Sequence, residues 1–225
     1  MSRSLPEPVL TALRTQLQIP AGMLQAGAQR VGWKVAASIP GVEDHLAPGG
    51  RVFGYLTSAT ELTPGQEGPP GRTAQLCAET ELAIELEHAL AAGADREAAS
   101  AAIGRLGVAL ELVDVGAGSS MHEVIAGNVY HQAVAFHFPS PAVRSVPSPL
   151  SAWLTIGQTS FHTDSDVDLA AVVLEMANML GPVGEQLQAG DRIIAGSLIH
   201  QPITADRTAT AGITGLGDVS CRTAP

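Results

Sequence analysis

The feature that most constrains this chain is a pair of glutamates, Glu79 and Glu81, set one residue apart inside an apolar run at residues 76–84. In a β-strand, side chains alternate between two faces, so both glutamates would point the same way. Two carboxylates side by side in a half-buried place repel each other and are costly to desolvate, and a bound divalent cation would relieve both costs. Carboxylate oxygens suit hard cations such as Mg²⁺ and Mn²⁺. The alternative is an amphipathic helix whose glutamates face water.

The second informative feature is a single lysine. The chain has 12 cationic residues, and all of them are arginine except Lys34. Lysine is a compact ammonium whose pKa shifts on burial, so it can exchange a proton or hold an enolate. Its neighbours Val31, Trp33 and Val35 are apolar, which argues against a lysine that simply faces water.

Length and charge limit the class of protein. We expect a single domain over residues 1–225, with a shortened helical region at 1–29 and a β-rich catalytic core at 30–225. The net charge of -10 argues against nucleic acid and membranes as partners, because both present anionic surfaces. No apolar stretch has the length of a membrane span and the N-terminus lacks a signal-peptide core, so a cytoplasmic protein is expected. The two cysteines, Cys77 and Cys221, are expected to be buried thiols.

Hydrophobic periodicity predicts the secondary structure. The clearest helix is expected over residues 165–180, where Ser165 and Asp168 would form a capping box. Further helices are predicted over residues 6–17 and 95–106, and strands over residues 30–37, 107–115, 192–195, 203–205 and 219–222. Many short strands with few helices predict an α+β domain built around a curved sheet or sandwich.

A third glutamate, Glu111, lies alone inside another apolar run at residues 108–113. Together with Glu79 and Glu81 it would complete a site of three carboxylates that leaves coordination positions for water and substrate.

The order and spacing of these motifs resemble the 2-keto-4-pentenoate hydratase/decarboxylase group of the fumarylacetoacetate hydrolase superfamily, from about residue 31 to the C-terminus. The matching segments are 32–38 (GWKVAAS), 79–81 (ETE), 111–113 (ELV), 127–128 (GN) and 189–198 (AGDRIIAGSL). The resemblance implies a fumarylacetoacetate hydrolase-like mixed β-roll or sandwich with flanking helices, assembled as a homo-oligomer.

The resemblance also implies an activity, that of a metal-dependent lyase of the hydratase/decarboxylase type. One divalent cation, Mg²⁺ or Mn²⁺, would be held by Glu79, Glu81 and Glu111. A small 2-oxo acid would chelate it through its carboxylate and 2-oxo oxygen, which stabilises the enolate that follows. Lys34 would contact that enolate or carry a proton. The residues implied to line the rest of the pocket are Ser38, Asn128, Ser197 and Leu198.

The chain departs from the group's pattern at two acidic positions. Val52 stands where the group has an acid before Phe-Gly, and Gly127 replaces the Asp of an Asp-Asn pair. Valine cannot transfer a proton, so the relay for water addition is altered. The residues that could replace the missing acid or base are Glu43, Asp44, His45, His131 and His200.

Several reactions therefore stay open. Hydration needs a substitute proton relay, whereas decarboxylation or tautomerisation needs only the cation and Lys34. Hydrolytic C–C cleavage, as in other branches of the superfamily, would need a His/Glu dyad such as His122-Glu123. A non-catalytic partner subunit of the same fold is the rival from another class.

Overall fold

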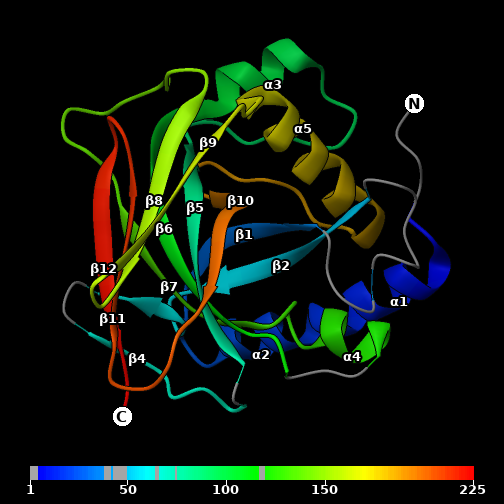
Figure 1. Cartoon of the computed structure of the whole chain (residues 1–225). Helices are drawn as coiled ribbons and strands as arrows, with labels where there is room; N and C mark the ends of the chain where they lie inside the picture. Colours follow the sequence, from blue (N-terminus) through cyan, green and yellow to red (C-terminus); the bar gives the residue numbers. More distant parts are fainter. Residues whose placement is uncertain (1–4, 38–41, 43–49, 64–65, 74, 117–119) are drawn as a thin grey trace.

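The computed structural model describes residues 5–37, 42, 50–63, 66–73, 75–116 and 120–225 of the chain, which form two sheets with flanking helices (Figure 1). The larger sheet contains, in spatial order, β2 (Arg51–Thr57), β1 (Arg30–Ala37), β10 (Arg192–Pro202), β5 (Leu76–Leu86), β6 (Ile103–Asp114), β7 (His131–His137) and β3 (Glu61–Leu62). The smaller sheet contains β4 (Glu67–Gly68), β12 (Gly217–Thr223), β11 (Thr208–Ile213), β8 (Leu150–Ile156) and β9 (Thr159–Ser165). The helices are α1 (Glu7–Gln16), α2 (Gln18–Gln25), α3 (Arg96–Ala102), α4 (Met121–Ala126) and α5 (Leu169–Leu180), followed by a 3-10 turn, η2 (Gly181–Val183).

The two sheets face each other, and the main hydrophobic core fills the space between them (Figure 1). The even-numbered residues of β5, Ala78, Leu82 and Ile84, are fully buried in this core. Between them, the Thr80 hydroxyl donates a hydrogen bond of 2.9 Å to the Trp153 carbonyl of β8 in the facing sheet. This two-layer arrangement with helices at its flanks confirms the predicted α+β class.

The carboxylates owe their placement to two long central strands, β5 and β6. β5 pairs antiparallel with β10 on one side and with β6 on the other, so neither of its edges is free. Because the even-numbered side chains of β5 enter the core, Glu79 and Glu81 project from the opposite face. The register sets Glu79 directly across from Glu111 of β6. The strand predicted for the Glu-Thr-Glu segment is therefore confirmed, and the alternative helix is wrong.

Some predicted boundaries are wrong. Ser165 ends β9, and α5 begins later, with Asp168 as its cap: the Asp168 carboxylate accepts from the Ala171 N–H. The helix predicted over 95–106 ends at Ala102, where the chain turns directly into β6. Residues 203–205 follow β10 and lie outside the named strands.

Strand 30–37 is found as predicted. No helix in the described part of the chain is long and apolar enough to cross a bilayer.

Candidate active site

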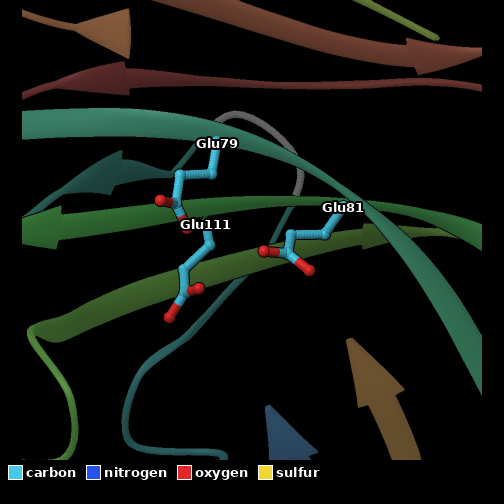
Figure 2. Close-up of side chains that lie close together, drawn as sticks. All are labelled: Glu79, Glu81 and Glu111. Carbon is cyan, nitrogen blue, oxygen red and sulfur yellow. The ribbon is translucent and has the colours of Figure 1, made fainter. Parts of the chain in front are cut away.

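Three glutamates converge on one spot on the face of the larger sheet that points away from the smaller one (Figure 2). Glu79, Glu81 and Glu111 each offer a carboxylate oxygen, and these oxygens all lie within 4.8 Å of one another. All three residues are buried, with Glu111 completely inaccessible and Glu81 only 2% exposed. Like charges opposite each other across strands are destabilising, so this arrangement calls for a compensating cation.

Each carboxylate has one oxygen engaged in a protein hydrogen bond. Glu79 Oε1 lies 2.5 Å from His200 Nδ1, and Glu81 Oε1 accepts from the Ser197 N–H at 2.9 Å. Glu111 Oε1 accepts from Lys34 Nζ at 2.6 Å and lies 2.7 Å from His131 Nδ1.

The second oxygens are the ones available to a ligand. The Oε2 atoms of Glu81 and Glu111 are buried and have no hydrogen-bond partner among the described residues. Leaving a buried carboxylate oxygen unpaired is costly, and two such atoms at one site are rare in folded proteins. A hard divalent cation prefers oxygen ligands and would satisfy both atoms, so these residues fit Mg²⁺ or Mn²⁺.

The pKa shifts of the glutamates follow from their unequal partners. Burial, followed by the charges of Glu79 and Glu111, raises the pKa of Glu81 well above its ordinary value. Burial also disfavours the charged form of Glu111, but Lys34 and His131 outweigh it and lower the pKa of that carboxyl. The surroundings of Glu111 therefore favour its charged form, whereas those of Glu81 disfavour the charged form.

Lys34, the only lysine, lies at the centre of the site. It is 4% exposed, and its ammonium also donates to the Val129 carbonyl at 3.2 Å. Burial lowers the pKa of Lys34, but the charges of Glu111, Glu79 and Glu81 outweigh it and raise that pKa above its ordinary value. Gly54, paired with Lys34 across β1 and β2, makes room for its stem: a Cβ there would lie 2.8 Å from Lys34 Cγ. The lysine is thus held as an ammonium facing the carboxylates.

Two histidines contact the carboxylates from either side. His131 is buried, and its Nε2 lies 2.9 Å from the Thr60 hydroxyl, so its ring is held at both nitrogens. His200 is partly exposed at the pocket, and hydrogen bonding to Cys77 and Glu79 raises its pKa to about 10. Both were among the possible substitutes for the missing acid or base, and the structure places both against a metal-ligand candidate.

A break in β10 brings the Gly-Ser-Leu element to the site. The pairing of β10 with β5 shifts register between Ala195 and Ile199. Gly196 has φ +129° and Ser197 has φ 35°, a backbone region that favours glycine. This bulge turns the Ser197 N–H toward Glu81 and leaves Ser197 and Leu198 lining the pocket.

Other residues singled out in the sequence lie elsewhere. The Asn128 amide is committed to the backbone of Tyr55, accepting from its N–H at 2.8 Å and donating to its carbonyl at 2.9 Å, and it does not line the pocket. Val52 is fully buried and Gly127 ends α4, so neither position supplies an acid. The positions that fall outside the described residues are Ser38, Glu43, Asp44 and His45.

The dyad considered for C–C hydrolysis is not at this site. His122 and Glu123 lie in the first turn of α4, where Glu123 forms a capping box with Ser120. Neither residue lines the pocket.

The carboxylates and Lys34 open into a cavity of about 770 Å³. Sequence reasoning missed most of its wall, which comes from β6, from the segment after α4 and from α5. The apolar side chains of this wall include Val35, Val113, Val115, Val129, Val167 and Val172. The alternation of Glu111, Val113 and Val115 in the sequence was the available signal: Val113 shares a face of β6 with Glu111, and Val115 is the first residue after the strand.

Comparison with known proteins supports the fold. No family model and no curated protein matches the chain, but many solved structures do. It is similar to 4-oxalocrotonate decarboxylase from Pseudomonas putida G7, complexed with calcium and acetate: TM-score 0.77, 20% identity, covering 94% of this chain and 84% of that one. It is also similar to fumarylpyruvate hydrolase from Pseudomonas aeruginosa, in complex with Mn²⁺ and pyruvate: TM-score 0.66, 18% identity, 87% and 89% covered.

A third similar structure is 5-carboxymethyl-2-hydroxymuconate delta-isomerase from Mycobacterium smegmatis, with TM-score 0.65, 14% identity and 87% and 80% of the two chains covered. These three structures share the fold of this chain, so the predicted fold is confirmed. A decarboxylase, a hydrolase and an isomerase share it, and the fold alone does not select the reaction.

Proposed function

We propose that this protein is a divalent-metal-dependent lyase that acts on a small 2-oxo acid or its enol. The observation that carries the proposal is the convergence of Glu79, Glu81 and Glu111, with two buried and unpartnered oxygens, beside the single lysine. The neighbours solved with Ca²⁺ or Mn²⁺ and with acetate or pyruvate support the ligand class.

The residues divide the chemical work among them. Bound Mg²⁺ or Mn²⁺ would polarise the 2-oxo group and stabilise the charge that develops on its oxygen. Glu79, Glu81 and Glu111 would hold the ion. The Lys34 ammonium holds its proton at Nζ and would place that positive charge beside the enolate oxygen. Lys34 is only 4% exposed, and this burial strengthens the interaction.

We propose a hydratase-like reaction, in which water adds to an unsaturated enol. Val52 supplies no proton relay, so another group must deliver the proton to carbon. Lys34 and His200 line the pocket, and each has a nitrogen within hydrogen-bond distance of one of the three glutamates, so they are the candidates for this role. Decarboxylation is the alternative reaction, and it requires no such relay.

The test combines product analysis with ion binding. The full-length protein with Mn²⁺ would be given 2-hydroxypenta-2,4-dienoate and, separately, a 2-oxo-enedioate. Mass spectrometry distinguishes gain of water from loss of CO₂. Gain of water supports the hydratase-like reaction, and loss of CO₂ would replace it with decarboxylation.

A non-catalytic subunit would turn over neither substrate. It could also lose the ion without consequence, so Mn²⁺ binding measured by electron paramagnetic resonance in the wild type and in Glu79→Gln separates the two classes. The homo-oligomer, the single domain and the cytoplasmic location stay predictions; light scattering tests the first of them.

A further inference from the structure

The cavity has two unlike ends. At one end lie the carboxylates and Lys34. The wall then continues through Val113, which follows Glu111 on the same face of β6, and through Val115, the first residue after the strand. Val129 closes one side next to the Lys34 ammonium, and Val172 faces the cavity from α5. A ligand chelated at the carboxylate end would therefore extend its tail along valines.

The cations that line the cavity already have carboxylate partners. Lys34 is paired with Glu111 and His200 with Glu79. The third, Arg51 at the start of β2, forms an ion pair with Glu175 of α5.

Two further acids reinforce this balance. Asp166 and Asp168 also line the cavity, where Asp168 is already paired with Arg96, so both bring carboxylates to the wall and neither frees a cation. Beyond the described residues, the chain's one remaining Lys or Arg is Arg3. A second carboxylate on a bound ligand would find no free cation among the described residues that line the cavity, and an unpaired buried carboxylate is expensive.

We propose that the pocket selects 2-oxo acids or enols with an uncharged, apolar tail and discriminates against dicarboxylates. Two features would determine this selectivity. The valines of the cavity wall suit an apolar tail, and the ion pair with Glu175 leaves Arg51 unavailable to a carboxylate on the ligand. This inference rests on the proposed function, because it concerns the tail of a ligand whose 2-oxo acid end is held at the glutamates.

An uncharged tail on the substrate limits which reactions the site can catalyse. Loss of CO₂ forms an enolate only when the departing carboxylate is β to the 2-oxo group, or is attached to the saturated carbon at the far end of a C=C bond that is conjugated with that group. The electron pair of the broken C–C bond then passes to the 2-oxo oxygen. Such a substrate has two carboxylates. A pocket that disfavours the second one selects hydration or tautomerisation over decarboxylation.

Three ligands of graded structure test the inference on the Mn²⁺-loaded full-length protein by calorimetry. Oxalate reports chelation alone. 2-Oxohexanoate and 2-oxoadipate have equal chain length and differ in their terminal group. We expect oxalate to bind, and 2-oxohexanoate to bind at least about tenfold more tightly than 2-oxoadipate, a difference that measures the rejected charge.

A substitution outside the cavity wall isolates the ion pair. Glu175→Gln leaves Arg51 without its partner, and we expect about a tenfold gain in affinity for 2-oxoadipate with no change for 2-oxohexanoate. Glu97→Gln, on the exposed surface of α3, is the matched control and should change neither affinity.

The outcomes separate the two proposals. If oxalate binds and 2-oxoadipate equals or exceeds 2-oxohexanoate, the inference is overturned while the proposed function stands. Oxalate binding with no binding of either longer acid also overturns it, as does CO₂ release from a 2-oxo-enedioate. Failure of oxalate to bind would overturn the proposed function, and the inference with it.

Discussion

Glutamates at the two ends of strand β5 have opposite electrostatic surroundings. Glu85 of β5 shares a face with Glu79 and Glu81, but its cross-strand neighbours are Arg105 and Arg192. Arg105 donates to its carboxylate at 2.7 and 2.8 Å, and Arg192 at 3.3 Å. Although burial raises the pKa of Glu85, these arginines outweigh it and lower that pKa.

At the other end, the residue across from Glu79 is Glu111, an acid opposite an acid. The pKa of Glu81 moves upward there, whereas that of Glu85 moves downward. Matched cross-strand charges stabilise a sheet and like charges do not. The comparison indicates that Glu85 stabilises the sheet through its two arginine partners. Glu79, Glu81 and Glu111 lack such partners, and their arrangement suits the binding of a cation.

The largest effect is expected at Lys34. Lys34→Met removes the ammonium from the enolate, and turnover should fall by about 10³-fold or more, the range of a positioned acid or charge. Mn²⁺ affinity should persist, because Glu111 keeps its unpartnered oxygen. Steady-state kinetics and Mn²⁺ titration measure the two quantities separately; undiminished turnover would remove the lysine from the mechanism.

The next effect contrasts the two ends of β5 directly. Glu81→Gln removes a ligand and should weaken Mn²⁺ binding by more than about 100-fold, whereas Glu85→Gln should leave it unchanged. Glu85→Gln should instead lower the free energy of unfolding by about 1 kcal/mol, since it breaks partly exposed arginine pairs. Calorimetry measures the Mn²⁺ affinity of each variant, and urea denaturation measures its free energy of unfolding. Equal Mn²⁺ affinities in the two variants would contradict the prediction.

A smaller effect is expected at His131, which orients Glu111. His131→Leu removes the hydrogen bond to Glu111 Oε1 and should weaken Mn²⁺ binding about tenfold. His131→Asn is the matched rescue, because its Nδ2 can occupy the place of Nδ1 and should restore most of the affinity. Similar losses in both variants would mean that the ring matters for packing alone.

The smallest effect is a dependence on pH. The raised pKa of Glu81 means that the metal-free folded protein keeps a proton that the unfolded chain loses, so this group's contribution to stability declines as pH rises through that interval. Ion binding needs the deprotonated form. The gain in Tm on adding Mn²⁺ should therefore be larger at about pH 8 than at about pH 5.5 by roughly 3 °C. Glu81→Gln should abolish the difference, and a gain that falls with pH would contradict the assignment.

The sequence was most predictive where a local pattern carried the information. Alternation in β5 places Glu79 and Glu81 on one face, and a sole lysine among apolar residues indicates burial. The contacts of His131 and His200 were not predictable, because each joins residues on different strands: His200 meets Glu79 from 121 positions away. Asn128 was expected to line the pocket, but its amide bridges a distant backbone. Asp168, rather than Ser165, caps α5 because β9 continues through Ser165.

The solitary lysine has a practical consequence. Apart from the N-terminal amine, Lys34 is the chain's one primary amine, and it is locked in an ion pair inside the cavity. An amine-directed reagent therefore has a single side-chain target, Lys34. The reactivity of Lys34 depends on whether its ion pair with Glu111 is intact and on whether a bound ligand covers it. Covalent labelling at one position can therefore report, molecule by molecule, on the state of the whole site.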